Sequence, residues 1–252
     1  FHLTAQAVII TSGGIGGNHD IVRRYWPERM GTPPRHMITG VPAYVDGRML
    51  DISAAAGVRL VNRDRMWHYN EGIQNWNPIW PGHAIRILPG PSSMWFDALG
   101  RRLPSPYLPG YDTLGTLRYL RTTDDLIEHD HSWFILTQKI IEKEFALSGS
   151  EQNPDITDGD WTAFLKDRLL GKGAPGPVEA FKDYGADFVV ADDLEELVAK
   201  MNALTDEALL DPTKVREQVE SRDLQFDNPY AKDAQVQGIH NSRRYIGDRL
   251  GR

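Results

Sequence analysis

The sequence predicts an α+β protein in which a strand, a glycine turn and a helix precede a larger set of mixed helices and strands. An apolar, β-branched run at 7–10 is typical of a buried strand, and it breaks into four glycines within five residues. Asn18 is then placed to cap a helix that Pro27 ends. Short apolar runs, amphipathic helical patterns and one hairpin pattern follow along the rest of the chain.

The glycine turn at residues 13–17 can approach a ligand closely. A strand, a glycine turn and a helix N-terminus together bring backbone N–H groups near a phosphate or a flavin. The same pattern also forms tight turns that bind nothing, and both interpretations stay open on spacing alone. The dinucleotide fingerprint G-x-G-x-x-G is absent, because the position three residues after Gly16 is His19.

Composition limits the class of protein. A chain of 252 residues favours one large domain or two small ones, and the net charge of -7 argues against a nucleic-acid binder. The absence of cysteine excludes disulfides and fits a cytoplasmic protein. No apolar run approaches the ~20 residues of a membrane span. The chain lacks an initiator Met and a signal peptide, so we expect a piece cut from a larger protein.

After the first strand and helix, residues up to about 103 predict one further helix, two strands and a hairpin. Asp46 is placed to cap a helix over 47–56, and Gly57 stands where a C′ glycine belongs. Alternation predicts strands over 58–62 and 66–69, whereas the Trp-, Asn- and Pro-rich stretch 72–91 is expected to be a loop. Gly100 closes a three-residue connection between 93–97 and 101–103, which is typical of a β-hairpin.

The remaining residues predict further helices with clear starting signals. Asp192 and Glu195 form a carboxylate capping box, followed by apolar residues at helical spacing that belong to the core. Pro212 fits the first turn of a helix that begins after Asp211. We expect helices over 112–121, 140–145, 161–170, 177–184, 194–204, from 212 and from about 235, strands over 133–136 and 188–191, a loop over 147–160 and a linker over 171–176.

Few residues are spaced as in a catalytic or metal-binding motif. His129-Asp130-His131 has the composition of a metal cluster, but its acidic, breaker-rich surroundings favour a solvated loop, and no metal is expected. In a strand, His68 would face away from Trp67 and Tyr69, either as a structural histidine or toward a cleft. Tyr111, beside a Pro-Gly turn, either transfers a proton or covers apolar surface.

Several motifs, in order, resemble one flavoprotein family. The stretch 5–18 resembles the alanine-rich strand ending in T-G-G-F-G-x-N of FAD-dependent fumarate reductase/succinate dehydrogenase-type flavoproteins. Residues 46–50 stand in place of the G-x-G-x-x-M-A helix, and 67–69 in place of the Q-x-H-P strand. Residues 94–103 resemble the hairpin I-x-V-N-x-x-G-x-R-F, and 188–204 the helix A-D-T-L-E-E-L-A. Together with 148–154, the chain is most similar to the ketosteroid-dehydrogenase-like branch of that family.

The resemblance implies FAD as cofactor and assigns roles to particular residues. Thr11, Ser12, Gly13 and Gly14 would contact the flavin. His68 and Tyr69 would bind a small, steroid-like substrate. Tyr111-Asp112 takes the place of an Arg-Asp pair whose arginine delivers the proton in fumarate reductases. A catalytic tyrosine fits a steroid-type oxidation better.

The resemblance also implies a division of the chain. Residues 1–40 would be a remnant of the FAD-binding domain, 41–225 a cap or substrate domain, and 226–252 a segment that returns toward the missing part. The expected activity is that of an oxidoreductase acting on CH–CH bonds. The alternatives are a fumarate reductase-like flavoenzyme, or an inactive cap-domain fragment that acts only as a binding module. Alone, the chain is expected to be inactive and not to retain FAD; its oligomeric state is open.

Overall fold

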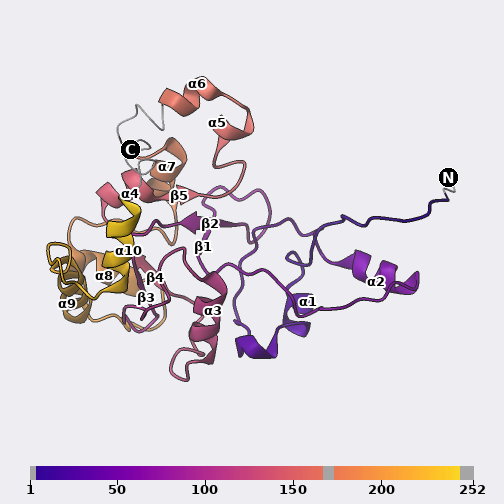
Figure 1. Ribbon diagram of the computed structural model, residues 1–252, viewed down its shortest axis with the longest axis horizontal. Helices are drawn as coiled ribbons and strands as arrows, with labels where there is room; N and C mark the ends of the chain where they lie inside the picture. The colour runs from indigo at the N-terminus through magenta and orange to yellow at the C-terminus, as the bar shows by residue number, and fades with distance from the viewer. Residues whose placement is uncertain (1–3, 167–172, 245–252) are drawn as a thin grey trace.

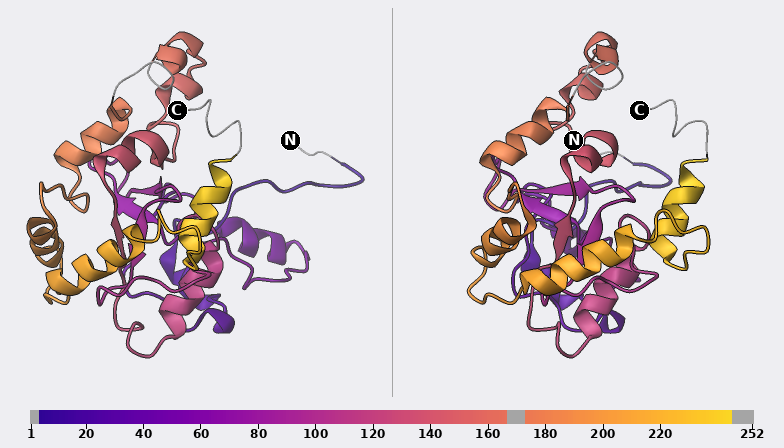
Figure 2. Two further views of the ribbon diagram at one scale, coloured as in Figure 1. Left: turned by 60° about the vertical axis from the view of Figure 1, so that its left-hand side comes forward. Right: turned by 90° about the vertical axis from the view of Figure 1, so that its left-hand side faces the viewer.

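The computed structural model describes residues 4–166 and 173–244 as a mixed α and β fold (Figures 1 and 2). Its strands are β1 (Gly72–Gln74), β2 (Ala84–Leu88), β3 (Met94–Phe96), β4 (Trp133–Ile135) and β5 (Ala146–Leu147). Its α-helices are α1 (His19–Arg24), α2 (Arg48–Ala55), α3 (Thr113–Thr122), α4 (Gln138–Glu144), α5 (Pro154–Thr157), α6 (Trp161–Phe164), α7 (Gly176–Tyr184), α8 (Leu194–Asn202), α9 (Pro212–Asp223) and α10 (Ala234–Ser242), with a 3-10 helix, η1 (Glu28–Met30). The expected mixture of helices and strands is confirmed.

A three-stranded antiparallel sheet, in the order β1-β2-β5, forms the first core. Ile73 pairs with Ile85, and Ile87 pairs with Leu147. Because side chains alternate along a strand, these residues share the face that packs against α4 and α7. The cluster is completed by Ile141, Phe145, Val178 and Phe181.

A second core lies under the two-stranded sheet of β3 and β4. Met94 and Phe96 are fully buried with residues of α8 and α9, among them Val198 and Val215. On the other face Trp95 stacks on Phe134 with ring centroids 4.6 Å apart. The expected hairpin is confirmed, since Leu103 N donates to Trp95 O at 2.8 Å, but 101–103 forms a single bridge rather than a strand.

Most helix starts agree with the sequence signals, although the N-cap of α2 is Gly47 and not the expected Asp46. The side chains of Asn18, Asp112 and Asp211 each accept a backbone hydrogen bond at the start of a helix, as expected. The cap of α8 is Asp193, which accepts from Glu196 N at 2.8 Å, so the expected cap at Asp192 is wrong by one residue. The expected helix over 161–170 is α6, a single turn, and its residues 167–170 lie outside the described ones, as do 171–172 of the expected linker.

The expected buried strand at 7–10 is wrong. These residues run as an extended, exposed arm (indigo in Figure 1), with Val8 81% and Ile9 86% exposed. A strand needs a neighbour for its backbone hydrogen bonds, and no described segment pairs with this arm. The arm, α1 and α2 lie at the opposite side of Figure 1 from the helices α7 to α10.

Three further strand assignments are corrected. Residues 58–62, 66–69 and 188–191 are extended or turning without pairing. Phe188 instead buries its ring edge-on against Phe145, so apolar contact alone explains its pattern. The expected loops 72–91 and 147–160 contain β1 and β2, and the end of β5 and α5, respectively. In β2 the alternation of Ile85, Arg86 and Ile87 is present in the sequence, but the surrounding Trp, Asn and Pro residues obscured it.

A buried arginine ties the N-terminal region to α3. Arg121 is 3% exposed and donates to the carbonyl oxygens of Thr32, His129 and Ile127. Asp130 lies beside it at 3.4 Å and also receives the backbone N–H groups of 35 and 36. The segment 129–131 is therefore a structural junction rather than the solvated loop expected. No helix in the described ranges is both long and apolar enough to cross a bilayer.

Candidate functional site

The glycine turn presents an open stretch of backbone at 11–14. Gly13 has a φ of +85°, a conformation that side chains disfavour. Thr11, Ser12, Gly13 and Gly14 are all exposed, and their backbone N–H groups donate to no described residue. Space is open beside Gly14, where an added Cβ would meet nothing within 4 Å. A side chain is therefore disfavoured at Gly13 and would be tolerated at Gly14.

The tightest contact of the turn is at Gly17, which sequence reasoning did not single out. Its N–H donates to Val45 O at 2.8 Å, and a Cβ there would lie 2.6 Å from Pro42 O. Thr39 Oγ1 also donates to Gly16 O at 2.9 Å. The second half of the turn thus packs against 39–45, whereas the first half is exposed. Four clustered glycines were the available signal, but spacing did not separate the two roles.

His68 is packed against Trp26, with ring centroids 4.7 Å apart. It is half-buried, and its Nε2 atom is buried with no partner among the described residues, as is Trp26 Nε1. Burial lowers the pKa of His68 below its usual value, because the protonated ring loses hydration. Two buried ring nitrogens without partners within one ring contact are unusual in a finished interior.

Tyr69 and Trp67 lie on the exposed side of the same segment. Their rings are 6.3 Å apart, and the guanidinium of Arg86 lies over the Tyr69 ring at 4.0 Å. The expected alternation, with His68 turned away from both neighbours, therefore fits the exposures even though the segment is not a strand. Arg86 on β2 was not expected here, since it belongs to the stretch assigned to a loop.

Tyr111 occupies the turn before α3 and is 75% exposed. Its backbone N–H donates to Leu108 O, and Asp112 is committed to capping α3. Within the described residues no hydrogen bond or ring contact joins Tyr111 to His68 or Tyr69. The structure brings His68 into contact with Trp26, and the roles of His68, Tyr69 and Tyr111 at a common substrate stay a prediction.

Metal-binding groups are not assembled in the described part of the chain. No set of three or more His, Asp or Glu residues is placed to hold an ion there. Asp130, the carboxylate of the 129–131 stretch, is instead directed toward Arg35 and Arg121.

Comparison with known protein families shows to which family the chain belongs. Residues 1–250 match the family described as FAD binding domain. The chain belongs to the FAD binding domain family. The expected flavoprotein family and its cofactor, FAD, are thereby confirmed at the level of the family.

Curated relatives of this FAD binding domain chain have one name in common. The chain is 56% identical over all its 252 residues to a KsdD-like steroid dehydrogenase of Mycobacterium tuberculosis (strain CDC 1551 / Oshkosh), and it covers 44% of that protein. A KsdD-like steroid dehydrogenase of Mycolicibacterium smegmatis is 53% identical and is 45% covered. The chain therefore spans less than half the length of these relatives. No solved structure matches it.

The open backbone at 11–14 fits one wall of a flavin site. The N–H groups there are free to donate, the residues are small, and the positive φ of Gly13 turns the backbone without a side chain in the way. These residues can contact only part of a dinucleotide, because they provide neither a G-x-G-x-x-G turn for the pyrophosphate nor an acidic ribose ligand.

Proposed function

We propose that this chain is part of an FAD-dependent dehydrogenase that oxidises a CH–CH bond of a ketosteroid-like substrate. The observation that carries the proposal is the 56% identity, along the whole chain, to a relative named as a steroid dehydrogenase. In such an enzyme the bound flavin accepts the hydride. The protein's share is to orient the substrate and to move a proton.

The proposal divides the chain by role. Residues 1–40 belong to the FAD-binding domain, with Thr11, Ser12, Gly13 and Gly14 at the flavin. Residues 41–225 form the cap over the substrate, and 226–252 return toward the flavin domain. The exposed, unpaired arm at 7–10 supports this division, because its β-branched residues have the composition of a strand within a larger sheet.

His68 and Tyr69 bind the substrate in this proposal. Nε2 of His68 has no partner and is buried in the chain alone, so in this proposal the ring turns outward to donate a hydrogen bond to a substrate carbonyl. Its lowered pKa keeps the ring neutral near pH 7. The rings of Tyr69 and Trp67 provide apolar surface for a flat hydrocarbon body.

Tyr111 is the proposed catalytic residue. Its side chain is 75% exposed at a turn, so the phenol is free to reach a bound substrate. Removing a hydride beside a carbonyl also requires loss of a proton from the neighbouring carbon. The side chain would take that proton as a phenolate, or as a phenol relay it to a further base. Among the other residues of the described turn 107–111, only Tyr107 carries a titratable side chain, and its ring is stacked on Tyr119.

The test uses the full-length protein, reconstituted with FAD and mixed without oxygen with a 3-ketosteroid. We expect bleaching of the oxidised flavin, and a loss of about 10²- to 10⁴-fold in its rate in Tyr111→Phe, the range typical of a removed general acid or base. Flavin content must stay equal in the two proteins. Tyr107→Phe is the matched control and should retain the wild-type rate.

Two results would contradict the proposal. Reduction of fumarate by the reduced flavin, with no oxidation of the steroid, would favour the fumarate reductase-like alternative. Full-length protein that binds the steroid but transfers no electrons would favour a binding module.

A further inference from the structure

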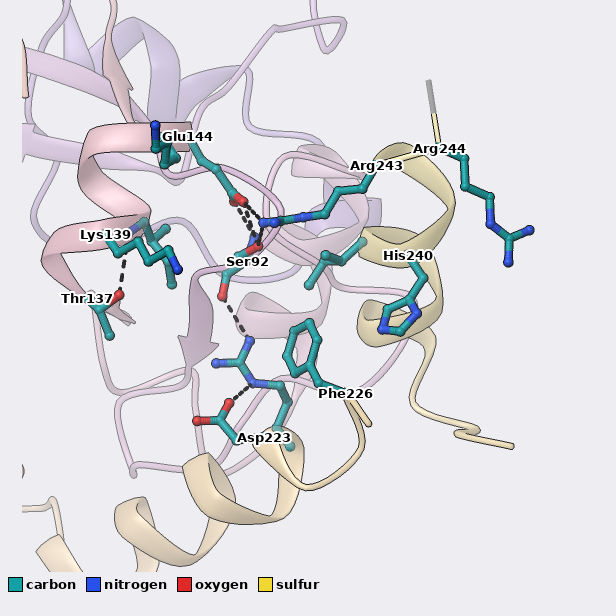
Figure 3. A pocket seen from close by; sticks show the side chains of 13 residues that line it. Ser92, Thr137, Lys139, Glu144, Asp223, Phe226, His240, Arg243 and Arg244 are labelled. Carbon is teal, nitrogen blue, oxygen red and sulfur yellow. Dashed lines mark hydrogen bonds and ion pairs between the residues drawn. The ribbon is translucent and has the colours of Figure 1, made fainter. Parts of the chain in front are cut away.

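A cavity of about 640 Å³ opens between α4, the end of α9 and α10, and it contains none of the residues discussed above (Figure 3). This volume is in the range of small-molecule sites. The apolar part of its lining is formed by Ile140, Ile239 and Phe226. Lys139 and Phe226 reach it from opposite sides in Figure 3.

The cavity is positively charged in a chain whose net charge is -7. Its two carboxylates are already paired. Glu144 accepts from Ser92 N, Ser92 Oγ and Arg243 Nη2, at 2.8, 2.7 and 2.6 Å. Asp223 faces Arg222 Nε at 2.8 Å. Lys139 and Lys143 also line the cavity, and neither has an ion-pair partner among the described residues.

The hydrogen bonding of Arg222 favours a ligand independently of the charge of the cavity. Its side chain is only 8% exposed, although it lines the cavity. Nη1 donates to Ser92 O at 3.0 Å, while Nε makes no well-directed hydrogen bond despite the nearby carboxylate of Asp223. Nη2 donates to no described residue. A buried guanidinium with unused donors is costly unless something completes its hydrogen bonds.

We propose that this cavity binds an anionic amphiphile. Arg222, Lys139 and Lys143 would hold its carboxylate or phosphate group, and Phe226 and Ile239 would contact its apolar body. The guanidinium keeps Nη2 free to donate to an anion, since Nη1 donates to Ser92 O and Nε faces Asp223, and two lysines add charge without fixed geometry. A bare inorganic ion would leave this apolar part of the lining uncovered. This inference is independent of the proposed dehydrogenase activity.

Calorimetric titration of the chain tests the proposal with four probes of one length: octanoate, octyl phosphate, octan-1-ol and octyltrimethylammonium. We expect at least one of the two anions to bind at least tenfold more tightly than the alcohol and the cation, and its affinity to fall as sodium chloride is raised. Preference for octanoate would identify a carboxylate as the natural group, and preference for octyl phosphate a phosphate. Failure of both anions to bind, or equal binding of octan-1-ol, would overturn the proposal.

Variants connect the binding to these residues. Arg222→Gln should abolish anion binding, and Arg222→Lys should retain part of it. Because Arg222 is buried and its variants can lose stability, the double variant Lys139→Gln/Lys143→Gln is the decisive one, since both lysines are exposed. The double variant should weaken anion binding at least threefold. Lys232→Gln, which changes an exposed lysine outside the cavity, should leave anion binding unchanged. Equal effects of the double variant and Lys232→Gln would refute the assignment.

Discussion

Nε2 of His83 faces Oε1 of Glu151 at 3.3 Å, and this contact ties the segment after β5 to the start of β2. The other ring nitrogen, Nδ1, accepts the backbone N–H of Ile79 at 3.2 Å. Since a backbone N–H can only donate, Nε2 carries the proton and donates it to Glu151. Trp80 stacks on the His83 ring with centroids 3.7 Å apart. The ring is 2% exposed, so its hydrogen bonds are formed within the fold.

We therefore predict that His83→Leu destabilises the chain by about 2–4 kcal/mol. The leucine fills the space but leaves the Ile79 N–H and the Asn75 amide without their buried partner. Urea denaturation followed by tryptophan fluorescence measures the change. Glu151→Gln is the control: its amide oxygen still accepts from Nε2, so we expect a cost below about 1 kcal/mol. A His83→Leu protein as stable as the wild type would contradict the network.

The two kinds of glycine in the turn give a second prediction. Gly17→Ala should destabilise the chain by about 1–3 kcal/mol, because its Cβ would lie 2.6 Å from Pro42 O and 3.0 Å from Val45 O, both backbone atoms. Gly14→Ala should change stability by less than about 0.5 kcal/mol, since its surroundings are open. The proposed contact with the flavin predicts the reverse order for FAD affinity. In the full-length protein, Gly14→Ala should weaken FAD binding more than Gly17→Ala does. Similar stability losses in both variants would show that the turn is packed differently.

Local signals in the sequence predicted most helices, because they depend on neighbouring residues. Asn18, Asp112 and Asp211 are capping residues whose partners lie two or three positions away. The hairpin at 93–103 was found for the same reason, since Gly100 closes it locally. The family resemblance came from short motifs in order, and the family match confirms it.

Pairing between distant segments could not be predicted in this way. A strand exists only where another backbone offers hydrogen bonds, so the apolar runs at 7–10 and 188–191 did not form strands, whereas β1 did. The contact of Trp26 with His68 spans two segments without a shared pattern. The same holds for the cavity between α4 and α10, where the bond from Arg243 to Glu144 joins residues far apart in sequence.

Buried histidines give a prediction about pH. Burial lowers the pKa of His68 and of His131 below the ordinary value of 6.5, so near and below that pH the unfolded chain binds more protons than the folded one. Stability should therefore be full above about pH 7 and fall as the pH drops through 6.5 toward the lowered pKa values, by at most about 1.4 kcal/mol per pH unit for each histidine. The midpoint of urea denaturation, measured at several values between about pH 7.5 and about pH 5, tests this. His68→Phe, which keeps the packing against Trp26, should flatten the profile; an unchanged slope would show that His68 is not responsible.

The last prediction concerns the cofactor. We expect the 252-residue chain, purified by itself, to be folded but colourless, whereas protein of the relatives' full length retains FAD. Two buried clusters, under the sheets β1-β2-β5 and β3-β4, provide a core that does not depend on a ligand. The flavin, in contrast, needs its pyrophosphate held at a glycine-rich helix N-terminus and its ribose at an acidic residue, and this chain contributes only the open backbone at 11–14. Circular dichroism measures folding, and the absorbance of flavin released on denaturation measures its content per chain. A yellow chain with one flavin per molecule would contradict the argument, because residues 4–244 would then have to contain most of the cofactor site.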